Sequence, residues 1–189
     1  MIPHAPNPHD KLTSTEFNQF QRIFIIENLF SNEMCDELVD YGRINATPAS
    51  NKHDRPHSIK LDHVFLPMDN KYHIYLQDAW NQAIEHFQFK IDFVEPYELK
   101  KYPTGGHFAR HIDNYHGLNL SVDRKLSMSI QLTDEKEYTA GNLVIGHRVA
   151  PKKKGTGIFF PSFYNHHVDA IATGERWSLI GWAWGPYWV

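Results

Sequence analysis

The C-terminal half of the chain, from about residue 94, consists of short apolar segments separated by turn signals. This pattern limits the possible folds more than any other feature of the sequence. The segments are rich in β-branched and aromatic residues and recur at roughly 8–12 residues, which is typical of strands in an all-β domain. Short strands without intervening helices favour a double-sheet jelly roll, which leaves few exposed sheet edges. The candidate strands are Val94–Tyr102, Phe108–His111, Leu126–Leu132, Asn142–Gly146, Gly157–Phe160, His166–Ile171 and Arg176–Trp184.

The N-terminal half has a mixed pattern. The apolar run Ile23–Ile26 predicts a strand, and Ser31 is a suitable N-cap for a helix over residues 32–44. The segment Ser58–Leu66 alternates as a strand does, whereas Lys71–Phe87 has the apolar spacing of a helix. We therefore expect a mostly β fold with supporting α-helices, in which the N-terminal helices pack on one sheet of a jelly-roll, cupin-like core.

Length and charge limit the domain count and the partners. A chain of 189 residues is long enough for one good core and short for two ordinary domains. We expect a single domain, with residues 1–93 as an α/β support segment and residues 94–189 as the double-sheet core. The net charge is -3 and the 19 basic residues are scattered, so the sequence predicts no nucleic-acid partner.

The chain carries no sequence feature of export or membrane insertion. Residues 1–14 lack a basic region followed by an apolar run, and no stretch approaches the roughly 18 apolar residues of a membrane span. The expected location is therefore cytoplasmic, without a membrane partner. Cys35 is the only cysteine, so any metal has to be held by histidine and carboxylate side chains.

One candidate metal-binding pair is His111 and Asp113, two residues apart at the end of a predicted strand. On an extended chain, residues i and i+2 point to the same side, so both side chains could reach one ion. With 13 histidines and 22 acidic residues in the chain, about 1.5 such pairs are expected by chance. His167 and Asp169 form a second pair of this kind, so the spacing alone decides little.

A third histidine, His166, lies on a later predicted strand, and Arg176 lies on the strand after it. Two histidines and one carboxylate on one face leave open positions on the metal, an arrangement typical of oxygen-activating Fe(II). A closed structural zinc site would need a fourth ligand, but the ligand types are compatible with a catalytic zinc that binds water.

Four motifs follow one another in order between residues 94 and 186. They are Tyr102-Pro103 with Gly105-Gly106-His107-Phe108-Ala109-Arg110-His111-Ile112-Asp113-Asn114; Arg124-Lys125-Leu126-Ser127; Ala140-Gly141-Asn142-Leu143; and Phe160-Pro161-Ser162 with His166, Val168 and Gly174-Glu175-Arg176-Trp177-Ser178-Leu179. In this order and spacing the chain resembles the prolyl 4-hydroxylase-like branch of the Fe(II)/2-oxoglutarate oxygenases. The resemblance implies a double-stranded β-helix fold, Fe(II), 2-oxoglutarate and O2 as co-substrates, and ascorbate as a supporting reductant.

The distal metal ligand has to be chosen between two adjacent histidines. The family pattern places an apolar residue two positions after this ligand, and His166 is followed by Val168 at that position. His167 would instead place Asp169 on the same inward face, at a desolvation cost unless that carboxylate were paired. We therefore expect His111, Asp113 and His166 to hold the metal and His167 to face outward.

Arg176 is the candidate anchor for the co-substrate. A guanidinium recognises a carboxylate bidentately, and the family uses Lys or Arg at this position for the carboxylate remote from the metal. Ser178 and Trp182 share its strand face, so Ser178 could add a hydrogen bond and Trp182 a wall. Tyr102 matches a family tyrosine near the co-substrate. Gln131 stands where the family often has a second co-substrate tyrosine, and its amide could still donate.

Other departures from the family pattern bear on the reaction class. Ala140 replaces the first glycine of a usual Gly-Gly pair, and Ala170 replaces a frequent proline. Asp113 is a carboxylate where halogenating relatives have Gly or Ala, so that branch is disfavoured. Trp182 stands where nucleic-acid demethylases of the superfamily have a second arginine, so that branch is disfavoured too.

The resemblance implies hydroxylation of an unactivated C–H bond with release of succinate and CO2, and a prolyl residue in a peptide or protein is the favoured target by analogy. One alternative is an oxygenase of the same chemistry that acts on a free amino acid or another small molecule. A second is a cupin-like metal-binding protein without catalysis, which would have no need of a buried Arg176. The loops at residues 45–57 and 114–124 are candidate substrate lids.

Overall fold

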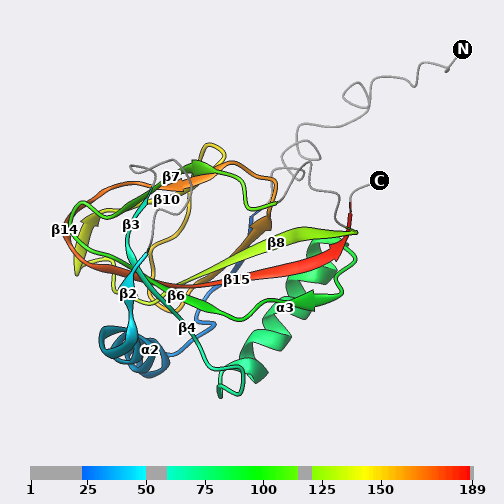
Figure 1. Ribbon diagram of the computed structural model, residues 1–189, viewed down its shortest axis with the longest axis horizontal. Helices are drawn as coiled ribbons and strands as arrows, with labels where there is room; N and C mark the ends of the chain where they lie inside the picture. The colour runs from blue at the N-terminus through cyan, green and yellow to red at the C-terminus, as the bar shows by residue number, and fades with distance from the viewer. Residues whose placement is uncertain (1–22, 50–58, 115–120, 188–189) are drawn as a thin grey trace, which may run out of the picture.

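Two antiparallel β-sheets form the body of the protein in the computed structural model, which describes residues 23–49, 59–114 and 121–187 (Figure 1). The larger sheet has the order β1 (Phe24–Ile26), β12 (Gly157–Pro161), β8 (Val122–Gln131), β15 (Arg176–Pro186), β6 (Glu98–Tyr102), β4 (Asp62–Phe65), β2 (Thr47–Pro48), with β5 (Phe93–Val94) also paired to β15. The smaller sheet has the order β11 (Arg148–Val149), β10 (Leu143–Ile145), β13 (His166–Val168), β7 (His107–His111), β3 (Ile59–Lys60). A separate ladder joins β14 (Ile171–Gly174) to β9 (Tyr138–Ala140).

Both described helices cover the outer face of the larger sheet (Figure 1). Helix α2 (Asn32–Asn45) is capped as expected by Ser31, whose side chain accepts a hydrogen bond from the backbone N–H of Met34 at 3.3 Å. Helix α3 (His73–Phe87) ends at Gln88, which adopts a left-handed conformation with φ 57°. Neither helix is long and apolar enough to cross a membrane.

Alternation along the two central strands separates an apolar core from a polar interior. On β8 and β15, one set of side chains packs against the helices; it comprises Leu126, Met128, Ile130, Trp177, Leu179 and Ala183. The alternate set lines a cavity between the sheets or lies beside it; it comprises Ser127, Ser129, Gln131, Arg176, Ser178, Ile180 and Trp182. A period of two on each strand therefore places polar groups inside the sandwich, where the site forms.

The expected fold class is confirmed, but several strand boundaries were wrong. Ser58–Leu66 is not one strand, because the chain crosses between sheets there: β3 joins the smaller sheet and β4 the larger one. Val94–Tyr102 divides into β5 and β6, and His166–Ile171 into β13 and the start of β14. Strands β9 and β11 were not predicted. Each is at most three residues long, too short to show a period.

Large parts of the two candidate substrate lids, the loops at residues 45–57 and 114–124, lie outside the described residues. Within the first loop, residues 47–48 form β2, which pairs with β4.

Candidate metal centre

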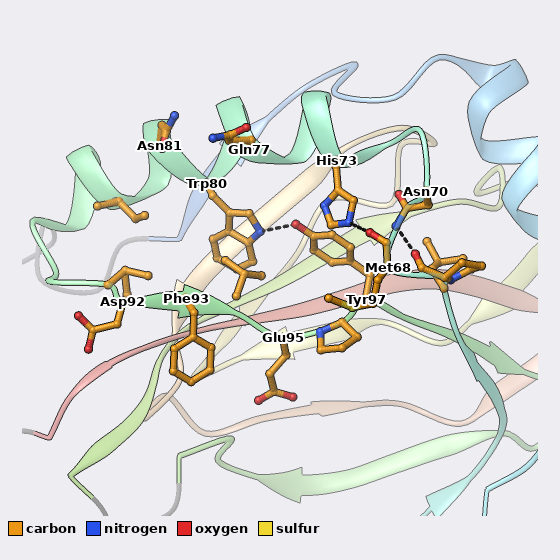
Figure 2. A pocket seen from close by; sticks show the side chains of 16 residues that line it. Met68, Asn70, His73, Gln77, Trp80, Asn81, Asp92, Phe93, Glu95 and Tyr97 are labelled. Carbon is orange, nitrogen blue, oxygen red and sulfur yellow. Dashed lines mark hydrogen bonds between the residues drawn. The ribbon is translucent and has the colours of Figure 1, made fainter.

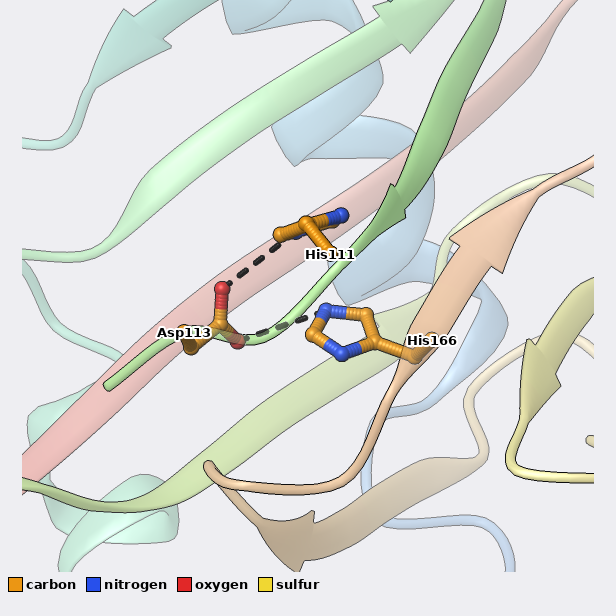
Figure 3. A group of neighbouring side chains, drawn as sticks. All are labelled: His111, Asp113 and His166. Carbon is orange, nitrogen blue, oxygen red and sulfur yellow. Dashed lines mark ion pairs between the residues drawn. The ribbon is translucent and has the colours of Figure 1, made fainter. Parts of the chain in front are cut away.

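The three residues expected to bind a metal lie together between β7 and β13 (Figure 3). His111 is the last residue of β7 and pairs in register with His166, the first residue of β13, while Asp113 lies two residues after the end of β7. One ligand atom from each residue lies within 4.8 Å of the others. The Nε2 atoms of His111 and His166 are each 3.4 Å from a different oxygen of Asp113. Strand pairing therefore brings together residues that are far apart in the sequence.

Both imidazoles are oriented by backbone hydrogen bonds. Nδ1 of His111 lies 2.7 Å from the carbonyl oxygen of Ala109, and Nδ1 of His166 lies 2.9 Å from that of Tyr164. A carbonyl only accepts, so each Nδ1 carries a proton, and in the neutral imidazole Nε2 then presents its lone pair toward the other ligand atoms. Burial lowers the pKa of His166 below its ordinary value, which favours the neutral, metal-binding form.

Asp113 is held in one orientation by the larger sheet. Its Oδ2 accepts a hydrogen bond from Ser127 Oγ at 2.6 Å, and its backbone N–H donates to the Ser162 carbonyl at 2.9 Å. Burial alone would raise the pKa of Asp113, but hydrogen bonding to His111 and the charges nearby hold it well below the ordinary value. The side chain is therefore an acceptor with a fixed direction, as a metal ligand requires.

His167 lies outside this cluster. Its Nε2 is 3.2 Å from Oδ1 of Asp169, so the second His-x-Asp pair of the sequence forms an ion-pair contact of its own. His167 is half-buried and lies opposite Val144 of β10. Among the two neighbouring histidines, His166 is the one that strand pairing directs at His111 and Asp113.

Arg176 is buried at the far end of the same cavity and has no acidic partner among the described residues. The side chain is 1% exposed. Its Nε donates to Gln131 Oε1 at 3.2 Å and its Nη1 to Ser178 Oγ at 3.4 Å, while Nη2 makes no hydrogen bond within the described chain. The guanidinium carbon lies 5.2 Å from the ring centre of Tyr102. Three of the sequence-predicted contact residues therefore surround this group.

Tyr138 also belongs to this end of the site, although the sequence did not indicate it. Burial raises the pKa of its hydroxyl, and the charge of Arg176 opposes that rise, so the two groups are close. The hydroxyl and Nε2 of Gln131 are both buried without a hydrogen-bond partner in the described structure. Only the pairing of Tyr138 with Gly174, two residues before Arg176, brings this tyrosine into place.

A single cavity joins the His111, Asp113 and His166 cluster to Arg176. Trp182 lines it, as expected, and is 6% exposed. Lys100 and Ser129 also line it and were not predicted; on β6, Lys100 lies on the same face as Tyr102. The sequence of β6 gave no sign of this, because a lysine does not mark an inward face.

A groove of about 480 Å³ beneath α3 contains none of these residues (Figure 2). Trp80 and Tyr97 lie in its wall, where the indole N–H of Trp80 donates to the Tyr97 hydroxyl at 3.1 Å. Its polar groups therefore partly satisfy one another, and it holds no cluster of metal-ligating side chains among the described residues.

The chain is similar to known oxygenases and hydroxylases in sequence. The sequence profile of the 2OG-Fe(II) oxygenase superfamily matches residues 97–184. A PKHD-type hydroxylase of Gluconobacter oxydans is 32% identical over 98 residues, which cover 48% of this chain and 43% of that protein. A PKHD-type hydroxylase of Acinetobacter baumannii is 26% identical over 194 residues, which cover 96% of this chain and 77% of that protein. The first relatives are thus matched over less than half of their own length.

Among solved structures, the viral collagen prolyl hydroxylase of Paramecium Bursaria Chlorella virus-1, in its 2OG complex, superposes with a TM-score of 0.68 at 18% sequence identity. The superposition covers 86% of this chain and 96% of the viral protein. At this level of identity the likeness concerns the fold. It identifies the two-sheet body as the double-stranded β-helix.

Proposed function

We propose that the chain is an Fe(II)- and 2-oxoglutarate-dependent dioxygenase that hydroxylates an unactivated C–H bond, because residues 97–184 match the profile of the 2OG-Fe(II) oxygenase superfamily. In this reaction the substrate C–H, 2-oxoglutarate and O2 give the alcohol, succinate and CO2. Bound iron supplies the redox chemistry that couples the decarboxylation to the hydroxylation. Ascorbate is the proposed supporting reductant.

The main support for this proposal is that the Arg176 guanidinium is buried and has no acidic partner among the described residues. A fully buried guanidinium is costly to leave without a counter-charge, so a ligand carboxylate is its natural partner. Arg176 has a spare Nη2, and the hydroxyl of Tyr138 and the amide nitrogen of Gln131 are also unpartnered there. These donors fit one end of a dicarboxylic acid, whose bidentate recognition suits a guanidinium. A metal-binding protein without a co-substrate would gain nothing from this arrangement.

The opposite end of the cavity fits the iron. We propose that Nε2 of His111, Nε2 of His166 and a carboxylate oxygen of Asp113 hold the metal, since two histidines and one carboxylate leave positions open for the co-substrates. The hydrogen bond from Ser127 keeps Asp113 in its orientation before the metal binds. The protein's own tasks are thus to bind the metal on one face and to fix the 2-oxo acid between the metal and Arg176.

For the substrate we propose a prolyl residue in a peptide or protein, by analogy with the relatives and structural neighbours. The alternative within the same chemistry is a free amino acid or another small molecule. A peptide substrate and a small-molecule substrate give different hydroxylated products, so an experiment can distinguish them.

The test is incubation of a proline-rich peptide library with the protein, Fe(II), 2-oxoglutarate, ascorbate and O2, followed by mass spectrometry and succinate measurement. We expect one added oxygen on defined prolines and an equal amount of succinate. An Asp113→Ala variant should give neither product, and a His167→Ala variant should resemble wild type. Succinate formed only with added free amino acids would support the small-molecule alternative. Absence of succinate under all conditions would refute the oxygenase proposal.

A further inference from the structure

Lys100 is a buried cation of the cavity for which the proposed chemistry has so far assigned no role. It lies in the middle of β6 and is 8% exposed, on the inward face that it shares with Glu98 and Tyr102. Its side chain lines the cavity that contains Asp113 and Arg176. A lysine is seldom this deeply buried unless it is paired or has a ligand.

The pairing of β15 with its neighbouring strands shows at which end of the cavity each side chain lies. At one end, Arg176 pairs with Tyr102 across β15 and β6. At the other end, Trp182 pairs with Ser127 across β15 and β8, and Ser127 is the residue that donates to Asp113. Trp182 therefore lies at the level of the metal ligands.

The ammonium of Lys100 extends from its strand toward that metal-binding end. Its Nζ lies 5.1 Å from the ring centre of Trp182 and 5.1 Å from that of Phe108. The Phe108 ring in turn stacks on the imidazole of His111, with 4.2 Å between ring centres. The ammonium is thus close to a ring that stacks on a metal ligand, and Asp113 is among the charges that act on it.

Lys100 pairs with one nearby carboxylate and keeps further N–H groups that could bind a ligand. Its one ion pair in the described structure is with Glu98, at 3.3 Å from Oε2, and the other oxygen of Glu98 contacts Nδ1 of His63 at 2.5 Å. Burial alone would lower the pKa of Lys100, but Glu98, then Tyr102 and Asp113, raise it, so the ammonium stays charged. An ammonium has three N–H donors, and within the described part of the chain only Glu98 engages one of them.

Trp182 adds an independent sign of a ligand at this place. Its indole N–H is buried and has no hydrogen-bond partner within the described residues. Leaving a buried donor unpaired costs free energy, so such groups usually meet a ligand or water. Lys100 and Trp182 are thus two donors near the metal ligands, at the opposite end of the cavity from Arg176.

We propose that Lys100 binds the 1-carboxylate of the 2-oxo acid, with the Trp182 N–H beside it, so that cations hold the co-substrate at both ends. This inference rests on the proposed function. It divides the recognition of the co-substrate: Lys100 contacts a group that every 2-oxo acid has, whereas Arg176 contacts a group that only the dicarboxylic ones have. The charges of the cavity are balanced in this arrangement. Fe(II), Asp113, Arg176 and a co-substrate with two negative charges sum to zero, and the pair of Lys100 and Glu98 is neutral as well.

The test compares binding of 2-oxoglutarate with that of 2-oxobutyrate, which lacks the remote carboxylate. Each is titrated anaerobically into the Fe(II) protein while the metal-to-ligand absorption band is followed. The central variant is Glu98→Gln/Lys100→Met, because it removes both charges and strands neither of them. Lys101→Met is the matched control, since this neighbouring lysine pairs with Asp62 and Glu175 outside the cavity.

We expect the double variant to bind both 2-oxo acids about tenfold to a hundredfold more weakly, the range for losing a hydrogen bond to a charged group. Arg176→Met should weaken only 2-oxoglutarate, and Lys101→Met neither. Wild-type affinity of the double variant for both acids would show that Lys100 is only the counter-ion of Glu98. Weakening of 2-oxoglutarate alone would place its action at the remote end; either result overturns the inference. If the wild-type protein gave no band with 2-oxoglutarate, the proposed function would fail as well.

Discussion

Replacement of Arg176 separates co-substrate binding from metal binding more cleanly than any other change. The guanidinium lies beyond the metal ligands, with Gln131 and Ser178 as its only hydrogen-bond partners in the described structure. If the remote carboxylate of 2-oxoglutarate contacts it, Arg176→Ala leaves that carboxylate unpaired in a buried pocket. Hydrogen bonds to charged groups contribute about 1.5–3 kcal/mol. At about 1.4 kcal/mol per factor of ten, affinity should fall about tenfold to a hundredfold.

Two companion variants make the test specific. Arg176→Lys should recover part of the affinity, because the charge remains while the planar fork is lost. Arg176→Met keeps much of the volume and removes a buried charge that has no acidic partner, so it should leave the ligand-free protein at least as stable as wild type.

The assay is anaerobic titration of 2-oxoglutarate into the Fe(II) protein, with Fe(II) affinity measured separately and stability measured by urea unfolding. Fe(II) affinity should hardly change in the three variants. Equal 2-oxoglutarate affinity in wild type and all variants would refute the assignment of Arg176. A parallel loss of Fe(II) affinity would mean that the residue supports the fold of the site instead.

Three further predictions concern single residues. His166→Ala should abolish Fe(II) binding and turnover while His167→Ala preserves both, and the reverse ranking in a metal-binding assay would move the ligand by one position. Burial raises the pKa of Cys35 to about 11, so at pH 8 its thiolate fraction should be on the order of 0.1%. The native protein should therefore resist a thiol reagent that labels it once unfolded, and rapid labelling of native protein would contradict this. Gly42→Ala should lower the free energy of unfolding by about 1–3 kcal/mol through overpacking, because a Cβ there would lie 2.3 Å from the ring of Trp177; an unchanged urea midpoint would contradict it.

Local patterns in the sequence were sufficient for much of the fold. The N-cap at Ser31 and the apolar spacing after it predicted α2, because both depend on residues within one or two helical turns. Alternation predicted the inward face of β15 from Arg176 to Trp182 for the same reason. Prediction failed where the chain changes sheets, as between β3 and β4, since an alternating pattern does not encode which sheet a strand joins.

The candidate site was also predicted only in part from the sequence. Spacing alone placed His111 and Asp113 on one side of an extended segment, and the apolar residue two positions after His166 favoured it over His167. The metal-binding geometry itself depends on the pairing of β7 with β13. Tyr138 and Lys100 escaped prediction because nothing near either residue in the sequence distinguishes it from a surface tyrosine or lysine.

The sequence by itself thus determined which side chains share a face of each element, since that follows from the fixed period of a helix or strand. Only the tertiary structure decided which faces meet. The register between β6 and β15 sets Tyr102 opposite Arg176, and the pairing of β9 with β14 brings Tyr138 to the same guanidinium. Such registers arise from packing between segments distant in the chain, and the period within one segment carries no information about its partner.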